Sequence, residues 1–300
     1  MTTTPRQLKE RYEQGQNITQ FLRNEMGEPH NTKEIIEIAY DLQTGSYISM
    51  VKDGEMAQRQ DRYSQEIVNI ITSLCQPTSI MEAGVGEATT LSGVLQYFGG
   101  GIIGYGFDLS WSRVFYAKKW LHSKGISNAV LCSGDLFNIP FADNSIDVVY
   151  TSHSIEPNGG NETPILKELY RVAKHYLILI EPGYEFASDE AKRRMDFHGY
   201  CRNLAGVAHS LNYDILRHQP FHLTISDPLN PSALIIIRKH PSDDMQQQYV
   251  LACPRFKTPL KYIGNMLFSP EALVVYPVIG GIPCLRIENG IFASKYDEVL

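Results

Sequence analysis

The stretch Ser79-Ile-Met-Glu-Ala-Gly-Val-Gly-Glu-Ala-Thr-Thr90 decides how this chain is expected to fold. Its apolar residues Ile80 and Met81 are typical of a buried strand, and Gly84 and Gly86 follow as a turn before a helix-like segment. A strand that ends in a glycine turn ahead of a helix is how an open α/β sheet builds a ligand crevice at its strand ends. Glycines suit this turn because a ligand can then lie against backbone that carries no Cβ.

The acidic residue at the entrance to the turn, Glu82, separates two classes of ligand. A carboxylate there repels the pyrophosphate of a dinucleotide and attracts a cation. The turn therefore favours S-adenosylmethionine, with its sulfonium and ammonium groups, over a dinucleotide. Taken alone, Glu82 would also fit the role of an acid that caps a turn or a helix.

Short apolar runs alternate with helical stretches after this turn, which predicts βα units and a mostly parallel sheet with helices on both faces. The last two runs follow each other without a helix long enough for a crossover, so we expect an antiparallel pair at one edge. The expected strands are 80–83, 102–107, 129–132, 146–150, 176–180, 215–216 and 234–237, and the expected helices between them are 89–97, 111–124 and 163–172.

The remaining pattern divides the chain into four expected parts. Residues 1–76 carry apolar residues at helical spacing, over 6–12, 18–26, 32–42 and 55–74, and are expected to form a helical lid or cap. Residues 77–240 hold the alternating pattern, a Rossmann-like α/β sheet of seven strands. Residues 241–248 are polar and unpatterned, as in a linker. Residues 249–300 are expected to form a small β-rich or α+β domain that leans on the main one.

Composition narrows the functional classes. The 300 residues carry a formal net charge of −6, which gives no general attraction to nucleic acid. Neither a membrane-spanning apolar run nor the apolar core of a signal peptide is present in the sequence. The five cysteines are scattered and no Cys-x-x-Cys occurs, so we expect a cytoplasmic protein without a disulfide framework.

Residues 79 to about 240 resemble the class I S-adenosylmethionine-dependent methyltransferases, through four motifs in the order of that family. The first is the turn itself, and the resemblance implies that Glu82-Ala83-Gly84-Val-Gly86 holds the methionine part of the cofactor. The second is Asp108, which closes the second expected strand; there the family binds both ribose hydroxyls. The neighbouring Leu109 is expected to lie beside the adenine.

Two further motifs complete the resemblance. Ser133-Gly134-Asp135-Leu136 ends the third expected strand, and in the family this acid accepts a hydrogen bond from the adenine amino group. Phe141 to His153 matches the fourth strand of the family, whose end faces the transferable methyl group. The resemblance thus implies cofactor contacts at Gly134, Asp135, Leu136 and Ser152, and S-adenosylhomocysteine as the product.

The acceptor of the methyl group is predicted from the loop after the fourth strand. Nitrogen-methylating members of the family often carry Asn/Asp-Pro-Pro-Tyr there, whereas this chain reads Thr151-Ser-His-Ser-Ile-Glu-Pro157. This favours a small-molecule acceptor, methylated on oxygen, such as a natural product or a sugar. His153 is the first candidate for a general base, and Glu156 and Glu181 are weaker ones. A histidine that only hydrogen-bonds to the loop or cofactor fits equally well, because methyl transfer can run on alignment alone.

Other polar residues are candidate contacts. Tyr47 and Gln43 precede the long helix that enters the sheet domain and are plausible lid contacts, although a helix stop at Gly45 with a packed tyrosine explains them as well. Asp196, His198 and Tyr200 follow the fifth strand, where the family often contacts substrate; a solvated helix face is the alternative.

Residues 249–300 resemble the small zinc-ribbon proteins that activate tRNA, ribosomal and release-factor methyltransferases. The resemblance rests on Leu251-Ala-Cys-Pro254 and on Tyr276-Pro-Val-Ile-Gly-Gly-Ile-Pro-Cys-Leu285. Two cysteines cannot close a zinc site that takes four thiolates, so no zinc or other metal is expected. Phe256 and Leu267 are expected to replace the metal by packing. In the family the ribbon adds a strand to its methyltransferase, so we expect this segment to support the catalytic domain or to form a homodimer contact.

Three alternatives stay open beside a small-molecule methyltransferase. The ribbon-like segment suggests a macromolecular substrate, such as tRNA, rRNA, protein or peptide, with the activator fused in one chain; the missing Asn-Pro-Pro-Tyr and the lack of a basic tract weaken it. A cofactor-binding regulator or scaffold would bind S-adenosylmethionine without methylating anything. An oxidoreductase fits least, because of the carboxylate at Glu82.

Overall fold

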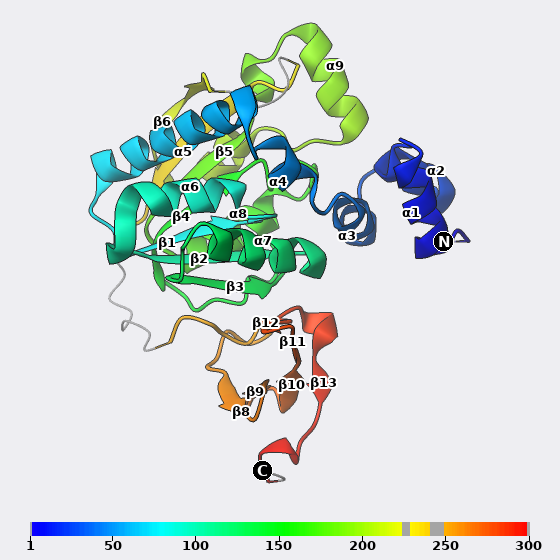
Figure 1. The fold of residues 1–300 in the computed structure, drawn as a ribbon. Coiled ribbons are helices and arrows are strands. Elements are labelled where there is room, and N and C mark those ends of the chain that lie inside the picture. The colour runs from blue at the N-terminus through cyan, green and yellow to red at the C-terminus, as the bar shows by residue number, and fades with distance from the viewer. Residues whose placement is uncertain (1, 224–228, 241–248, 299–300) are drawn as a thin grey trace.

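A seven-stranded sheet lies at the centre of the protein (Figure 1). The computed structural model describes residues 2–223, 229–240 and 249–298, so the predicted linker, 241–248, lies outside the described residues. The strand order is β3-β2-β1-β4-β5-β7-β6. The strands are β1 (Ser79–Ala83), β2 (Ile103–Asp108), β3 (Ala129–Ser133), β4 (Ile146–Ser152), β5 (Ala173–Pro182), β6 (Asp214–Phe221) and β7 (Ser232–Arg238).

The pairing directions confirm the predicted sheet. Strands β1 to β5 pair in parallel, whereas β7 pairs antiparallel with both β5 and β6. The last two strands therefore form the antiparallel edge pair that the missing crossover helix predicts. The fold is α/β and Rossmann-like.

Helices cover both faces of the sheet, as expected (Figure 1). One face packs against α5 (Gly54–Leu74), α6 (Thr89–Phe98) and α7 (Trp111–Ser123), and the other against α8 (Glu162–Val172) and α10 (Leu204–Ser210). A further helix, α9 (Asp189–His198), follows β5. The described residues also form short 3₁₀ segments, which are η1 (Gly99–Gly101), η2 (Tyr184–Phe186), η3 (Ile287–Asn289) and η4 (Tyr296–Glu298).

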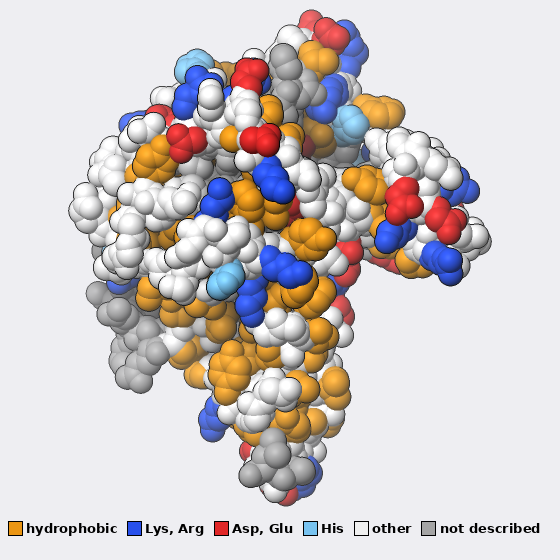
Figure 2. Space-filling view, in the orientation of Figure 1, with side chains coloured by type: hydrophobic (Ala, Val, Ile, Leu, Met, Phe, Trp, Pro, Cys, Tyr) orange, Lys and Arg blue, Asp and Glu red, His pale blue; other side chains and the backbone are white. Residues whose placement is uncertain are grey.

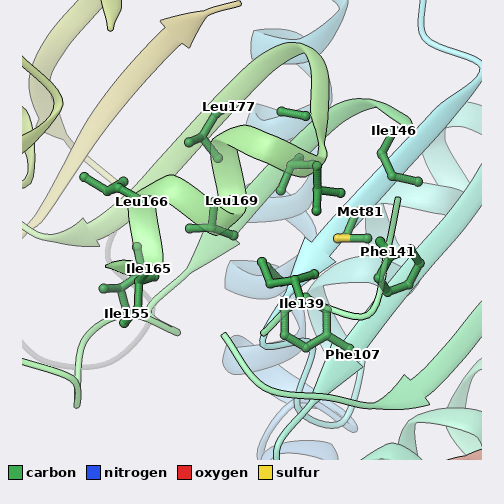
Figure 3. Close-up of a cluster of buried hydrophobic side chains, with 14 of the residues drawn as sticks. Met81, Phe107, Ile139, Phe141, Ile146, Ile155, Ile165, Leu166, Leu169 and Leu177 are labelled. Carbon is green, nitrogen blue, oxygen red and sulfur yellow. The ribbon is translucent and has the colours of Figure 1, made fainter. Parts of the chain in front are cut away.

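The two faces hold two separate hydrophobic cores. Successive strand residues point to opposite faces, so Ile80 belongs to the core under α5 and α6, and Met81 to the core under α8. Figure 3 shows Met81 beside Phe107 and Phe141 in the second of these cores. Because both sides of β1 are buried, the adjacent residues Ile80 and Met81 are both apolar, without the alternation of a half-exposed strand.

The N-terminal helices are α1 (Pro5–Glu13), α2 (Ile18–Met26), α3 (Lys33–Leu42) and the short α4 (Ser46–Met50), which the sequence pattern does not predict. Helices α1 to α3 share a small cluster of their own, around Leu8, Leu22 and Ile35. The long α5, by contrast, places Tyr63, Ile67 and other residues in the core of the sheet.

The C-terminal segment is β-rich, as expected. One sheet has the order β13-β10-β9-β8, and β11 pairs with β12. The strands are β8 (Lys261–Ile263), β9 (Met266–Ser269), β10 (Val274–Tyr276), β11 (Val278–Ile279), β12 (Ile282–Pro283) and β13 (Ile291–Phe292). Figure 2 shows hydrophobic side chains on the surface of this segment, and Tyr262, Ile291 and Phe292 are among its most exposed residues.

The interior of this segment differs in part from the prediction. Leu267 is buried as expected, but Phe256 is 54% exposed, so its predicted packing role is wrong. Phe268 and Tyr276 are buried in that segment, and the Cys253 thiol lies 3.6 Å from the Tyr276 hydroxyl. Among the residues that the structure describes, no group of three or more His, Cys, Asp or Glu side chains is arranged to hold a metal ion.

Backbone hydrogen bonds join the C-terminal segment to the β3 edge of the main sheet. Leu285 donates its N–H to the Ser133 carbonyl at 2.8 Å, beside a parallel bridge between Ser133 and Cys284. A second bridge joins Phe141 to Leu251. The segment therefore contacts the carboxyl end of the edge strand β3 and the loop that follows it.

Two further features are the state of the cysteines and the character of the helices. All five cysteines are free thiols, four of them buried. The helices in the described part of the chain include none with the length and apolar character to span a membrane.

Candidate functional site

A cavity of about 620 Å³ opens at the carboxyl ends of β1, β2, β3 and β4. It brings together nearly every residue that the sequence singles out for the cofactor or for catalysis. Among the residues that line it are Glu82, Gly84, Gly86, Asp108, Leu109, Gly134, Asp135, Leu136, Ser152, His153, Glu156, Tyr47 and Gln43. Ala83 is not among them: it is fully buried and pairs within the sheet with Phe107 and Thr151.

The glycine turn has the geometry that its sequence predicts. Gly84 and Gly86 have φ angles of 71° and 52°, the left-handed region that favours glycine. The Gly86 N–H donates to one Asp108 carboxylate oxygen at 2.9 Å, and the Ser110 N–H donates to the other at the same distance. A Cβ on Gly84 would lie 2.3 Å from the Ser154 Cβ, so the turn has no room for a side chain there.

Glu82 lies on the cavity wall but is only 3% exposed. The Tyr150 hydroxyl donates to its carboxyl at 3.2 Å. Burial raises the pKa of Glu82 to about 8, and the hydrogen bond from Tyr150 only partly opposes that rise. Ionised Glu82 is therefore costly in the empty site, and a cationic group beside it would lower that cost.

Arg113 on α7 is a site residue that the sequence analysis misses. Its side chain is buried, lines the cavity and lies over the rings of Tyr47 and Tyr40, 4.7 and 5.3 Å from their centroids. Burial lowers the pKa of Arg113, but the charges of Asp108 and Glu87 outweigh this and raise it. Within the described residues its Nε has no hydrogen-bond partner. Arginine on an amphipathic helix is normally solvated, so the pattern gives no signal for this residue.

Glu87, inside the glycine turn, connects the turn to the N-terminal helices. Its carboxylate accepts hydrogen bonds from the N–H groups of Gly45 and Ile48, both at 2.9 Å. These two donors lie at the start of α4, which carries Tyr47. The unpredicted helix α4 is thus fixed to the turn, and Tyr47 is held against Arg113.

His153 stands where β4 ends, in a left-handed conformation with φ of 55°. Its Nδ1 lies 2.5 Å from a Glu156 carboxylate oxygen, and its Nε2 lies 2.8 Å from the Ser232 hydroxyl. Burial lowers the pKa of His153, but its hydrogen bond to Glu156 and the charge of Glu156 outweigh burial and raise it. Burial acts to raise the pKa of Glu156, and the bonds from His153 and Asn230 more than reverse this.

Glu181, the weakest candidate base, holds the loop in place. It does not line the cavity and is 1% exposed. Its carboxylate accepts hydrogen bonds from the N–H groups of Ser154, Ile155 and Glu156, at 3.0 to 3.2 Å. Burial raises its pKa to about 7. The prediction of Glu181 as a base is therefore wrong: it is removed from the cavity and fixes the turn that presents His153.

The stretch after β5 contributes two of its three candidate residues. His198 and Tyr200 line the cavity with their rings stacked at 5.3 Å, whereas Asp196 points elsewhere and pairs with Arg202 at 2.9 Å. The other polar side chains on this part of the wall come from several elements: Asn31, Asn158, Asn230 and Ser232.

Comparison with known proteins identifies a methyltransferase domain and its fold. Residues 80–175 match the family model described as a methyltransferase domain. Magnesium protoporphyrin IX methyltransferase from Synechocystis PCC 6803 with bound S-adenosylhomocysteine is 16% identical, covers 69% of this chain and 99% of its own, and superposes with a TM-score of 0.52. The same enzyme with bound S-adenosylmethionine is 15% identical, covers 69% and 97%, and has a TM-score of 0.52. These likenesses show the fold.

Residues 80–175 are therefore a methyltransferase domain, in a chain that has the class I methyltransferase fold. A second likeness concerns a short segment: 40 residues, 13% of this chain, are 42% identical to a UPF0434 protein from Vesicomyosocius okutanii subsp. Calyptogena okutanii (strain HA) and cover 68% of it. By this match a segment of the chain belongs to the UPF0434 family.

The raised pKa of Glu82 predicts a stability that depends on pH. The folded protein holds a proton on Glu82 up to about pH 8, and the unfolded chain loses it near pH 4.5, so this group destabilises the fold as pH rises between these values. Glu82→Gln should therefore raise the melting temperature of the cofactor-free protein by a few degrees at pH 9, from ~1 kcal/mol or more, and by much less at pH 5.

Scanning calorimetry of both proteins between pH 5 and 9 measures this difference, with the exposed Glu55→Gln as the matched control. A melting-temperature difference that stays constant across this range would show that Glu82 is ionised at no special cost.

Proposed function

We propose that this methyltransferase acts on an oxygen atom of a small molecule, such as a natural product or a sugar, with His153 as the general base. The observation that supports this most is the pair formed by His153 and Glu156 at the cavity wall, where β4 ends. A carboxylate that holds an imidazole by Nδ1 orients the ring and favours its protonated form. Such a pair suits the removal of a proton from a hydroxyl group.

The cavity residues fit the cofactor in its chemical parts. When bound, S-adenosylmethionine supplies a methyl group on a positively charged sulfur. We assign Glu82 to the cationic methionine end, where its carboxylate gains a partner. Asp108 is assigned to the ribose hydroxyls and Asp135 to the adenine amino group, because both are acceptors that end neighbouring strands and line the cavity. Gly84 and Gly86 leave room for the ligand along the turn.

The apolar contacts of the adenosine part are assigned to Leu109 and Leu136, which follow Asp108 and Asp135 and line the same cavity. Gly134 follows the end of β3, Ser152 ends β4, and both line the cavity. We assign no direct cofactor contact to the side chain of Ala83, since it is buried in the sheet.

Arg113 is assigned to the carboxylate of the cofactor's methionine part. Its guanidinium is buried beside Gly86, where an ideal Cβ would lie 3.6 Å from the Arg113 Cζ. Its neighbours are two tyrosine rings and Glu87, whose carboxylate oxygen lies 4.0 Å from Nε, beyond hydrogen-bond distance. Its Nε therefore has no hydrogen-bond partner in the described part of the chain. A carboxylate would satisfy this buried donor.

The size and polarity of the cavity support a small acceptor. Its volume of about 620 Å³ has to hold the adenosine and methionine parts of the cofactor as well as the acceptor. The wall near His153 carries Asn158, Asn230, Tyr200 and Ser232, which offer neutral hydrogen bonds. The Asn230 carboxamide oxygen has no partner among the described residues. A compact acceptor with several hydroxyl groups fits this lining.

A macromolecular acceptor is the second candidate, favoured by the match of one segment to a UPF0434 protein. In this version residues 249–300 are a degenerate zinc ribbon fused to its own methyltransferase, and the substrate is tRNA, rRNA, protein or peptide. The net charge of −6 argues against an RNA substrate.

We further propose cytoplasmic localisation, in line with the five free thiols, and a homodimer that covers exposed residues such as Phe292.

The two acceptor classes can be separated by size. If the acceptor is small, the enzyme and radiolabelled S-adenosylmethionine will label compounds in the low-molecular-mass fraction of a cell extract, and leave its RNA and protein unlabelled. Liquid chromatography of both fractions measures this, with the Asp108→Asn variant as the control that should label neither. Label confined to the macromolecular fraction would favour the second candidate.

His153 as a base predicts a pH profile. The methylation rate should fall as pH drops below the raised pKa of His153, because the protonated ring cannot accept the acceptor's proton. His153→Gln should lower kcat by about 10²- to 10⁴-fold and remove this pH dependence, while S-adenosylhomocysteine affinity stays within about twofold. Initial rates with the labelled acceptor measure this.

The exposed His122→Gln is the matched control for that series, and it should keep the wild-type profile. A His153→Gln enzyme with wild-type kcat would mean that alignment alone drives the reaction.

Arg113 as the carboxylate ligand predicts a selective loss of affinity. Arg113→Met should weaken S-adenosylhomocysteine binding by about 10- to 100-fold, the range for a hydrogen bond to a charged group. Decarboxylated S-adenosylhomocysteine should bind the variant and the wild type equally. Titration calorimetry with both ligands measures this, with the exposed Lys119→Met on the same helix as the control. Equal losses for both ligands would refute the assignment.

A further inference from the structure

One face of helix α3 carries charged residues spaced four apart, Lys33, Glu37 and Asp41. Each of them is bound by a different part of the protein. Asp41 accepts hydrogen bonds from the hydroxyls of Ser110 and Ser112, at 2.7 and 3.1 Å, where α7 begins. Lys33 and Glu37 both line the cavity. Helix α3 is therefore a wall of the cofactor cavity that is held by charge and not by the sheet's hydrophobic cores.

Arg286, in the C-terminal segment, is the partner of Glu37. Its guanidinium binds both Glu37 carboxylate oxygens, one of them at 2.8 Å from Nη2, and also binds Glu288 at 2.6 Å. Its Nη1 lies 3.5 Å from the carbonyl of Leu109, the residue assigned to the adenine. Arg286 is 8% exposed, and these two carboxylates raise its pKa although burial lowers it. This geometry is a forked contact, which a lysine could not reproduce.

Lys33 forms further ion pairs, which join α3, the residues after β3 and the C-terminal segment. Lys33 lies 3.0 Å from an Asp135 carboxylate oxygen and 2.8 Å from Glu288. The other Asp135 oxygen accepts the N–H of Phe137 at 2.9 Å. Close by, Leu285 is hydrogen-bonded to Ser133, two residues before Asp135. The C-terminal residues 284–288 thus lie against the strand end that carries the proposed adenine acceptor.

We propose that residues 284–288 of the C-terminal segment belong to the cofactor site. Arg286 is a positioning residue for the adenosine end of the cofactor. Arg286 and Glu288 hold α3 across the cavity and fix Asp135 through Lys33, so the site is complete only when the C-terminal segment is docked. The inference rests on the proposed placement of the adenosine at Leu109 and Asp135. It goes beyond a supporting or dimerising role for this segment.

The test is a double-mutant cycle in the full-length protein, measured by titration calorimetry with S-adenosylhomocysteine and with adenosine. Arg286→Met should weaken both ligands by about tenfold, within the usual range for coupled sites. Glu37→Gln breaks the same pair from α3 and should have a similar effect. The double variant should be hardly weaker than either single variant, because both remove one contact. Arg286→Lys, which keeps the charge but loses the fork, should recover only part of the affinity.

Lys257→Met is the matched control, since Lys257 also anchors the C-terminal segment but binds Glu168 on α8, 2.9 Å away, and neither residue lines the cavity. It should lower the melting temperature and leave both affinities unchanged. The inference is overturned if Arg286→Met binds both ligands within twofold of the wild type, or if Lys257→Met weakens them equally. A wild type that binds neither ligand would instead refute the proposed placement of the cofactor, and Arg113→Met tests the methionine end independently.

Discussion

The cavity depends on the point at which the strand order changes direction. From β1 the chain adds β2 and β3 on one side of the sheet, and then returns to add β4 and β5 on the other. The loops after β1 and β4 therefore diverge, and a crevice is left between them at the carboxyl ends of the strands. Glu82, Asp108, Asp135 and His153 meet there because each lies at, or one or two residues from, the carboxyl end of its own strand, although they span 72 residues of sequence, from 82 to 153.

The charge around this crevice is imperfectly balanced in the absence of ligand. Burial raises the pKa of Glu82 to about 8, and Arg113 keeps a buried Nε without a hydrogen-bond partner among the described residues. A buried carboxylate without a cationic partner and a buried guanidinium nitrogen without an acceptor both cost stability. Both costs fall when a ligand with an ammonium and a carboxylate lies between the two side chains. The α-amino acid end of the cofactor has these two groups. In the proposed placement, binding of the cofactor removes both of these costs.

The cavity residues that the sequence singles out and those that it does not differ in how their side chains reach the cavity. Asp108 and Asp135 are set by the backbone, so a strand ending and a motif were enough to place them. Arg113 and Arg286 reach the site by long side chains from a helix and a distant segment, and no local pattern records this. Ser232 is different, because it begins β7, and an antiparallel strand starts where its parallel neighbours end. The predicted reversal of the last strands therefore already implied a residue there.

The C-terminal segment also answers a problem of the sheet itself. Strand β3 is at the edge of the main sheet, and an uncovered edge offers its N–H and carbonyl groups to other chains. The bridge between Ser133 and Cys284 occupies part of that edge. Ion pairs then secure the segment at two ends, with Lys257 on Glu168 and Arg286 on Glu37. The C-terminal segment has only two cysteines, Cys253 and Cys284, too few for a four-thiolate zinc site, and these contacts with the methyltransferase domain help to fix its shape.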